Sequence, residues 1–296
     1  MDIVARDLRS HAVEPSPNGI ALRASFDALG GNTTLATMLT EFGAERRGHR
    51  HLDEATTFIV SGHGFTEVRP DEDGPATRIS WSAGDVFAIP ANAWHRHEGT
   101  SAEPARQLTF KTTPLMTRLF GSRAFVRDNP FRFDDRYADS DTWRRAVRVA
   151  DWGEATAGQA LAGQATAGQA LAGDPPPALE DRPDLGDGVA TALIPLAGQR
   201  MLEPWLVDLR PSARIASRRN RAEEVCLVLE GSGRTTLFDV DGGDLAIDWS
   251  AGDLVARPAG VAHASAAGAA GARLLVIRNV FIDLALGPLR AALPAG

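Results

Sequence analysis

The stretch WSAGDVFAIPANAWH, from Trp81 to His95, returns almost unchanged as WSAGDLVARPAGVAH, from Trp249 to His263. Nine of the fifteen positions are identical, and the second copy begins 168 residues after the first. Both copies keep a Gly-Asp pair, a proline and a final histidine. A repeat of this kind in a chain of 296 residues predicts two copies of one structural unit.

The residues ahead of each copy predict β-strands. TTFIVSGHG at 56–64 and VCLVLEGSG at 225–233 are rich in residues that favour strands, and both end in small-residue turns. Several short strands separated by Gly and Pro favour a sandwich or a barrel. We therefore expect an all-β chain with a first domain at residues 1–130, a linking segment at 131–184 and a second domain at 185–296.

The linking segment contains a decamer written twice, ATAGQALAGQ and then ATAGQALAGD, over residues 155–174. It has little apolar bulk to bury, and its regular glycines weaken the helix propensity of its alanines. Together with the DPPP that follows, it predicts a flexible linker. Residues 140–151 have a plausible helix cap and a helical spacing of Trp143, Val147 and Ala150, so we expect a helix there.

Composition and charge exclude several classes of function. The formal net charge of −7 argues against nucleic acid as the main partner, because phosphate binding needs a basic face. The chain has no apolar run long enough to cross a membrane, and its start has no secretory signal pattern. The single cysteine, Cys226, fits a reducing compartment, so we expect a cytoplasmic protein. A homo-oligomer is compatible with the sequence.

Three histidines of the first copy form a candidate metal site. His49 and His51 are two residues apart, so on a strand they face the same side, and His95 ends the repeated stretch after a turn at Pro90. Imidazole ligands suit zinc, copper, iron or nickel rather than magnesium or calcium. Three neutral ligands also leave coordination positions open for water or a substrate.

These residues resemble the cupin pattern, in which an HxH pair and a strand ending in Gly precede G-x5-P-x-[G/N]-x2-H. Gly84, Pro90, Asn92 and His95 fit the second motif position by position. The doubled pattern resembles a bicupin, which implies two double-stranded β-helix barrels. The HRH pair, together with the WHRH element at 94–97, is similar to the gentisate 1,2-dioxygenase group of bicupins.

The first copy departs from the general cupin pattern at the position of the usual glutamate. Ala55 occupies that position, and the adjacent Glu54 has the opposite strand parity, which predicts a salt bridge or a capping role. Thr109 stands where gentisate enzymes are expected to carry an acidic residue.

The second copy has lost most of the metal pattern. Arg218 and Asn220 replace the two histidines of the HxH pair, whereas Glu224 and His263 remain. Because a guanidinium repels a divalent cation, we expect Arg218 to pair with Glu224 and the chain to hold one metal ion.

The resemblance implies a non-haem Fe(II) dioxygenase that acts with dioxygen on a small hydroxylated aromatic or related carboxylic acid. Zinc, nickel, manganese and copper are alternative ions for His49, His51 and His95. We expect Arg47 to meet the substrate carboxylate and His97 to orient the substrate, and the small Ala55 and Thr57 to leave room beside the metal. A metal-dependent isomerase, cyclase or lyase, and a non-catalytic small-molecule-binding protein, are the alternatives.

Overall fold

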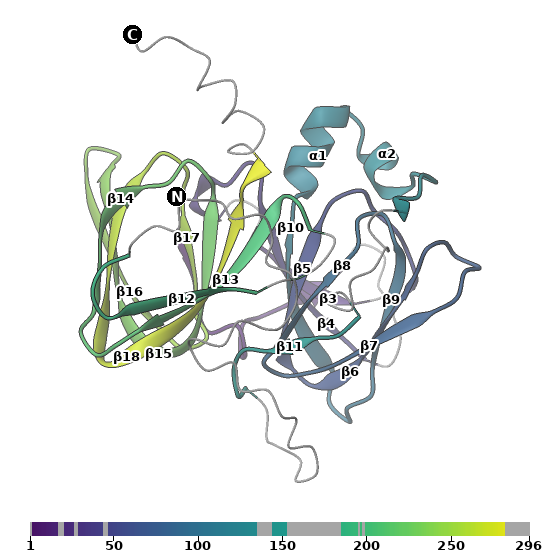
Figure 1. The fold of residues 1–296 in the computed structure, drawn as a ribbon, viewed down its shortest axis with the longest axis horizontal. Coiled ribbons are helices and arrows are strands. Elements are labelled where there is room, and N and C mark those ends of the chain that lie inside the picture. The colour runs from purple at the N-terminus through teal and green to yellow at the C-terminus, as the bar shows by residue number, and fades with distance from the viewer. Residues whose placement is uncertain are drawn as a thin grey trace.

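The computed structural model describes residues 2–16, 21–26, 29–43, 47–134, 144–152, 185–194, 196 and 199–281. Two β-barrels lie side by side in this part of the chain (Figure 1). The fold expected from the repeat, an all-β chain of two barrels, is confirmed. The tandem decamer at 155–174 lies outside the described residues, and its role as a linker stays a prediction.

The first barrel consists of a large and a small antiparallel sheet. The large sheet has the order β11-β8-β5-β10-β4-β3-β2, and the small sheet has the order β7-β6-β9. The strands are β2 (Glu14–Pro15), β3 (Leu22–Ser25), β4 (Ala36–Phe42), β5 (Ala55–Ser61), β6 (His63–Arg69), β7 (Thr77–Ser82), β8 (Asp85–Ile89), β9 (Trp94–Gly99), β10 (Ala105–Lys111) and β11 (Val147–Arg148).

The second barrel is one sheet with the order β1-β17-β15-β18-β13-β12, to which β14 and β16 add as partners of β18 and β15. Its strands are β1 (Val4–Ala5), β12 (Val189–Leu193), β13 (Leu202–Leu209), β14 (Arg214–Arg219), β15 (Glu224–Val240), β16 (Gly243–Ser250), β17 (Leu254–Arg257) and β18 (Ala262–Asn279). Each of the long strands β15 and β18 runs unbroken where the first barrel has two successive strands.

Helices are few among the described residues. They are the 3-10 turn η1 (Leu29–Gly31) and the helices α1 (Thr113–Phe120) and α2 (Arg123–Arg127), which follow the first barrel. None of them is long and apolar enough to cross a bilayer. The helix expected over 140–151 is wrong in its described part, because residues 144–145 form a bend and Val147–Arg148 form β11. The weak local helix preference is outweighed there by backbone pairing with β8.

Each barrel is completed by a short strand that precedes the other barrel in sequence. The N-terminal β1 pairs with β17 of the second barrel, with Val4 opposite Val255. The linking strand β11 pairs with β8 of the first barrel, with Val147 opposite Val86. The expected domain boundaries therefore follow chain order, whereas in space the two edge strands are exchanged between the barrels.

The repeated Gly-Asp pair receives these exchanged strands. Asp85 accepts a hydrogen bond from Arg148 at 2.5 Å, and Asp253 accepts the equivalent bond from Arg6 at 2.7 Å. Each aspartate also accepts from the backbone N–H of the serine three residues before it, which closes the turn. The repeated sequence thus encodes a docking turn for an incoming strand.

The glycine of each pair is required at its position. Gly84 and Gly252 have φ angles of +88° and +97°, a region that disfavours side chains. A Cβ on Gly84 would lie 1.8 Å from the carbonyl oxygen of Ala150. Both glycine carbonyls accept a hydrogen bond from the docked segment, from the backbone N–H of Val149 and Leu8 respectively, each at 2.9 Å.

Two buried glutamates join the barrels in a reciprocal manner. Glu54, just before β5, accepts hydrogen bonds of 2.7–3.2 Å from the backbone N–H groups of residues 200–202 in the second barrel. Glu223, just before β15, accepts 2.6–2.9 Å bonds from the N–H groups of residues 33–35, and further bonds from two threonine hydroxyls there. The capping role predicted for Glu54 is confirmed.

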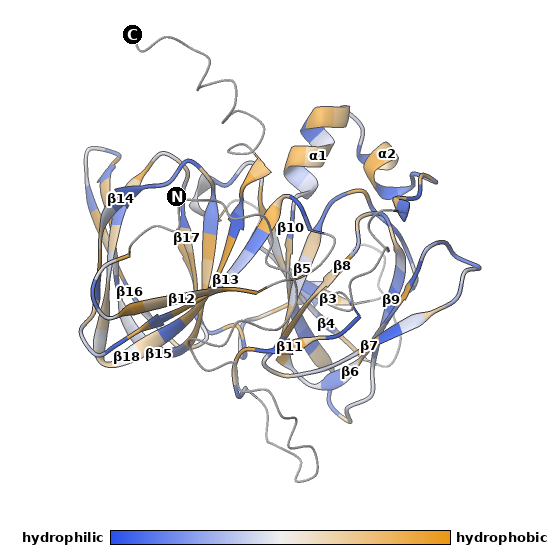
Figure 2. Ribbon diagram, viewed as in Figure 1, coloured by the Kyte–Doolittle hydropathy of each residue, from blue (hydrophilic) through white to orange (hydrophobic). Residues whose placement is uncertain are grey.

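A continuous hydrophobic core lies between the barrels. Buried residues of the large sheet and of the second barrel form one cluster, which includes Leu39, Phe58, Leu108, Leu206, Leu227 and Leu275. Figure 2 shows hydrophobic residues recurring along the strands of both barrels. Burial of each such side chain contributes about 2 kcal/mol, so the barrels stabilise each other.

We predict that Glu223→Ala lowers the free energy of unfolding by about 3 kcal/mol, because three backbone N–H groups and two hydroxyls lose a charged acceptor. Chemical denaturation measures this difference. Glu230→Ala is the matched control, because Glu230 is exposed and its ion pair with Arg273 is 3.9 Å long. Equal effects of the two variants would contradict the role assigned to Glu223.

A second prediction concerns Glu67 on β6. A hydrogen bond from Arg96, supported by Arg78 and Arg69 and opposed by burial, lowers the pKa of Glu67 from 4.5 to about 2. A folded pKa below the unfolded one gives stability that is present above pH 4.5 and is lost as the pH falls toward 2. Glu67→Gln should therefore be less stable than the wild type at neutral pH, with a difference that shrinks across this window. Urea denaturation at several pH values tests it, and a difference independent of pH would refute it.

Candidate metal centre

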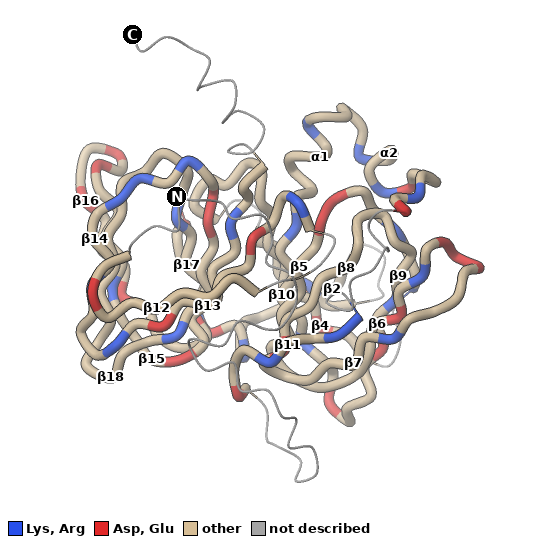
Figure 3. The backbone as a smooth tube through the Cα atoms, viewed as in Figure 1, with Lys and Arg blue, Asp and Glu red and all other residues tan. Residues whose placement is uncertain are grey.

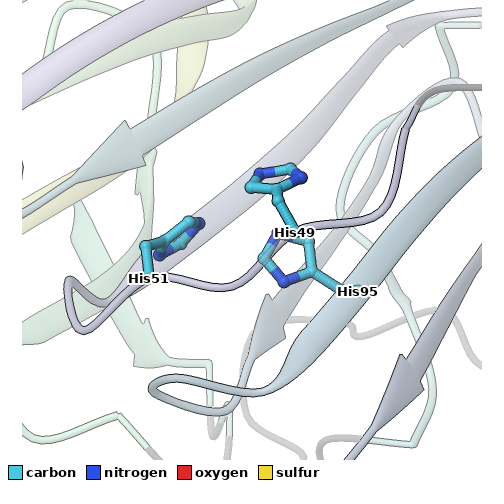
Figure 4. Close-up of side chains that lie close together, drawn as sticks. All are labelled: His49, His51 and His95. Atoms are coloured by element: carbon cyan, nitrogen blue, oxygen red, sulfur yellow. The ribbon is translucent and has the colours of Figure 1, made fainter. Parts of the chain in front are cut away.

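The three predicted histidines come together at one end of the first barrel. Their ligand atoms all lie within 4.8 Å of one another, and the rings converge (Figure 4). His95 lies on β9, whereas the strand expected at 48–51 is not formed. An isolated bridge holds this segment instead, in which the His49 and His95 backbones exchange hydrogen bonds of 2.8 and 3.0 Å. The bridge gives His49 the position that a full strand was expected to give it.

One nitrogen of each ring is held by the backbone. Each Nδ1 lies within hydrogen-bond distance of a carbonyl oxygen two residues away: Arg47 for His49 at 3.3 Å, Asp53 for His51 at 2.9 Å and Ala93 for His95 at 2.9 Å. Because a carbonyl only accepts, each Nδ1 carries the proton and each Nε2 carries the lone pair. The Nε2 atoms are therefore the ligand atoms.

Burial keeps the imidazoles neutral. It lowers the pKa of His49 far below its usual range, and the nearby His95, His51 and Lys111 lower it further. Burial also lowers the pKa of His51, against the opposing charge of Asp53. Neutral rings keep their lone pairs available for a metal at neutral pH.

The site fits a divalent transition metal. His51 Nε2 is buried and has no hydrogen-bond partner, which is costly for a polar atom unless a ligand binds it. Among the described residues, this histidine set is the group found close enough to hold an ion. An all-imidazole donor set suits zinc, copper, iron or nickel.

A narrow cavity lies beside the three histidines. Its free volume is about 10 Å³, roughly the space of one water molecule. Its other lining residues are Met38, Ala55, Thr57, Ile89, His97, Gln107, Thr109 and Lys111. Thr57 Oγ1, Gln107 Oε1 and Thr109 Oγ1 are buried without hydrogen-bond partners. The cavity therefore presents several unsatisfied polar atoms to a small polar ligand.

The other predicted residues lie partly in the cavity wall and partly outside it. Ala55 and Thr57 line the cavity, as the sequence indicated, and Glu54 points away to the second barrel. Arg47 is exposed and does not line the cavity, so its contact with a substrate stays a prediction. Lys111, the only lysine of the chain, lies in the cavity wall instead. Sequence reasoning missed it, although it shares the strand parity of Thr109.

The His97 ring contacts a side chain, whereas the rings of His49, His51 and His95 contact backbone carbonyls. His97 Nδ1 lies 2.8 Å from Thr66 Oγ1, which also accepts a hydrogen bond of 3.0 Å from the Trp81 indole. Since a hydroxyl accepts up to two hydrogen bonds and donates one, the contact with Thr66 holds the His97 ring in either tautomer. His97 lines the cavity next to the three histidines.

The equivalent place in the second barrel is filled by charged side chains. His263 Nε2 lies 3.5 Å from both Arg218 Nε and Asn220 Nδ2, so its lone pair faces donors. The expected pairing of Arg218 with Glu224 is confirmed at 3.6 Å. Ser265 stands where the first barrel has His97, next to an identical Trp–Thr hydrogen bond.

The comparisons with known proteins agree with this architecture. Residues 37–111 match the family model described as "Cupin domain". Acireductone dioxygenase of Rattus norvegicus is 44% identical over 48 residues, which is 16% of this chain and 26% of that protein. The Bacillus subtilis enzyme is 34% identical over 64 residues, 22% of this chain and 34% of that protein. The chain thus matches about a quarter to a third of the length of these curated relatives.

Solved structures resemble the chain over almost its full length. Salicylate 1,2-dioxygenase from Pseudoaminobacter salicylatoxidans, in a variant complex with gentisate, has a TM-score of 0.64 at 16% identity and covers 94% of this chain and 80% of its own. Oxalate decarboxylase from Lactobacillus farciminis, in a formate complex, has a TM-score of 0.56 at 12% identity and covers 94% and 86%. The chain therefore shares the two-barrel fold of these structures, and its residues 37–111 match a cupin domain.

We predict one metal ion per chain, and that His49→Ala, His51→Ala and His95→Ala each remove it, because two imidazoles cannot hold the ion firmly. His263→Ala should keep the metal and cost about 1 kcal/mol of stability. His97→Ala should lower turnover more than metal content. Elemental analysis of the five variants measures the metal content, and denaturation and activity assays measure stability and turnover. Loss of metal from His263→Ala with retention in His49→Ala would assign the site to the other barrel.

Proposed function

We propose that the protein is a metal-dependent dioxygenase that acts on a small hydroxylated aromatic or related carboxylic acid, with Fe(II) held by His49, His51 and His95. The observation that carries the proposal is the convergence of three neutral imidazoles, each tethered through Nδ1, with a buried Nε2 of His51 that has no partner. The dioxygenase names of the acireductone and salicylate enzymes support it.

Iron bound at this site would supply open coordination positions and the electrons that dioxygen chemistry needs. Zinc, nickel, manganese and copper are alternatives for the same imidazoles. The protein's own contribution is to hold the ligands, orient the substrate and limit water. The free volume of about 10 Å³ has room for one water molecule, so binding of such an acid requires the lining side chains to move.

Lys111 is the residue that we assign to the substrate carboxylate. It is the one lysine or arginine among the residues that line the cavity, and its charge reaches His49 and His51 strongly enough to lower their pKa values. An ammonium in a largely buried wall binds an anion more strongly than one in water does. Its position on β10 places it across from Ala55, beside the ligands.

We assign to His97 a hydrogen bond to the substrate. In the tautomer with the proton on Nε2, it would donate to a substrate oxygen in the cavity, while Thr66 and Trp81 fix the ring. A hydroxyl that loses its proton during the reaction is stabilised by such a donor. The two threonine hydroxyls and the Gln107 carbonyl, which have no partners, complete the polar lining.

A metal-dependent isomerase, cyclase or lyase is the second candidate, and the similarity in fold to an oxalate decarboxylase favours keeping it. Such an enzyme would use the ion as a Lewis acid without consuming dioxygen. The two functions separate in one experiment. Fe(II)-loaded protein is mixed with gentisate, salicylate, acireductone or oxalate, and oxygen uptake and product are followed together.

Substrate-dependent oxygen uptake that is lost in His95→Ala supports the dioxygenase. Product formation without oxygen uptake would instead establish the second candidate. Tight binding of acids without turnover by the metal-loaded protein would indicate a non-catalytic binding protein.

We predict that Lys111→Met raises KM for acidic substrates about tenfold or more, because an ion pair in a partly desolvated wall is lost, and that it leaves the metal content unchanged. Steady-state kinetics and elemental analysis measure both. Arg47→Gln is the control, since this side chain is exposed. A larger effect of Arg47→Gln than of Lys111→Met would restore the assignment made from the sequence.

A further inference from the structure

Three arginines surround one buried glutamate in the interior of the second barrel. Arg278 Nε lies 2.9 Å from Glu224 Oε1, and Arg218 and Arg257 lie 3.6 and 3.7 Å from Glu224 Oε2. We call Arg218, Arg257 and Arg278 the arginine cluster. By strand register, Glu224, Arg257 and Arg278 correspond to Ala55, Ile89 and Lys111, so the cluster occupies the same end of its barrel as the metal centre does.

Two carboxylates lie in reach of the three guanidinium groups among the described residues. They are Glu224 and Glu203, which lies 3.7 Å from Arg278. Glu223 is turned away and bound to residues 33–35. Burial, followed by the charge of Arg257, lowers the pKa of His263 to about 4, and burial raises that of Cys226 to about 11, so both are neutral at pH 7.

The hydrogen bonds of the cluster are incomplete. Arg257 has a side chain only 2% exposed, yet its Nε has no hydrogen-bond partner. Glu224 Oε2 has ion-pair neighbours but no hydrogen bond, and the bond from Arg218 to His263 is long, at 3.5 Å. Burying a guanidinium with unused donors is costly, and an oxyanion is the ligand that satisfies both its charge and its N–H groups.

The cluster can be reached from solvent. The side chains of Arg218 and Arg278 are 22% and 23% exposed, whereas that of Arg257 is 2% exposed. Figure 3 shows basic residues gathered at one end of β14. The cluster therefore combines two partly exposed arginines with one buried arginine.

We propose that the second barrel binds a small oxyanion, a carboxylate or inorganic phosphate, between Arg218 and Arg257. The planar guanidinium of the partly exposed Arg218 presents paired donors, and the unused Nε–H of the buried Arg257 donates to an oxygen of the anion. Asn220 contributes an amide donor next to His263. Arg218 and Asn220, which stand where the first barrel has His49 and His51, would thus serve a ligand of the opposite charge to a metal ion.

The test is isothermal titration calorimetry of the metal-loaded protein with phosphate and with acetate, each against sodium chloride at equal ionic strength. Arg218→Gln should weaken binding about tenfold or more, because charge-assisted hydrogen bonds are lost. Arg219→Gln is the matched control, since Arg219 is exposed and donates to the Gly260 carbonyl. Lys111→Met removes the carboxylate contact proposed for the first barrel, so the anion binding that this variant retains, and that Arg218→Gln weakens, belongs to the second barrel. The ratio of the phosphate and acetate affinities identifies the type of oxyanion.

Glu224→Gln gives a test in the opposite direction. Removing the internal carboxylate should strengthen anion binding, and phosphate should raise the melting temperature of this variant more than that of the wild type. Circular dichroism checks the fold of each variant, and Arg218→Lys, which keeps the charge but loses the fork, replaces Arg218→Gln if that variant does not fold.

Three results would overturn the proposal. They are no binding beyond the chloride control, equal weakening by Arg218→Gln and Arg219→Gln, and loss of binding in Lys111→Met with retention in Arg218→Gln. In the last case the anion would occupy the metal centre.

Discussion

The reciprocal glutamates at the barrel interface are the constraint on which the geometry of the site depends. Glu54 is fixed by backbone N–H groups of the second barrel, and it lies between His51 and the first residue of β5. The second barrel therefore holds in place the segment in which His51 Nδ1 contacts the Asp53 carbonyl oxygen. A carboxylate that is desolvated and bound by several N–H groups is a rigid anchor. The second barrel thus shapes the candidate metal site, although His49, His51 and His95 all come from the first barrel.

The two copies of the repeat share the contacts that hold the fold together, whereas several residues inside the two barrels differ. The conserved Trp donates to a threonine in both barrels, and the Gly-Asp turn receives an exchanged strand in both. None of these contacts involves a metal ligand. The interior residues at 49, 51 and 97 have become Arg218, Asn220 and Ser265 in the second barrel. The residues inside the barrels can differ because the contacts that fix the fold lie outside this interior.

The sequence was sufficient for the fold class and for the grouping of His49, His51 and His95, because both rest on local signals: alternation along strands and a fixed spacing after a proline turn. It was insufficient for the exchange of β1 and β11, since a two-residue strand is defined only by its partner in the other barrel. The helix predicted near Val147 failed for the same reason. The prediction of Arg47 rests on strand parity with His49 and His51, whereas that segment forms only a bridge at His49. Along the regular strand β10, Lys111 lies on the same face as Thr109, and both line the cavity.

The electrostatics of the first barrel explain why an acid and a metal ion would bind together. Lys111 lies in the same cavity wall as the three neutral imidazoles, so a dipositive ion would be repelled by its ammonium. Asp53, whose oxygen is 3.5 Å from His51 Nδ1, offsets part of this charge from outside the ligand set. A carboxylic acid substrate would bring a negative charge next to both cations and relieve their repulsion. Binding of the acid and of the metal should therefore each strengthen the other, by a coupling that is reciprocal. If Lys111 meets the substrate carboxylate as we propose, a neutral molecule of the same shape should bind less tightly, because it would leave the repulsion in place.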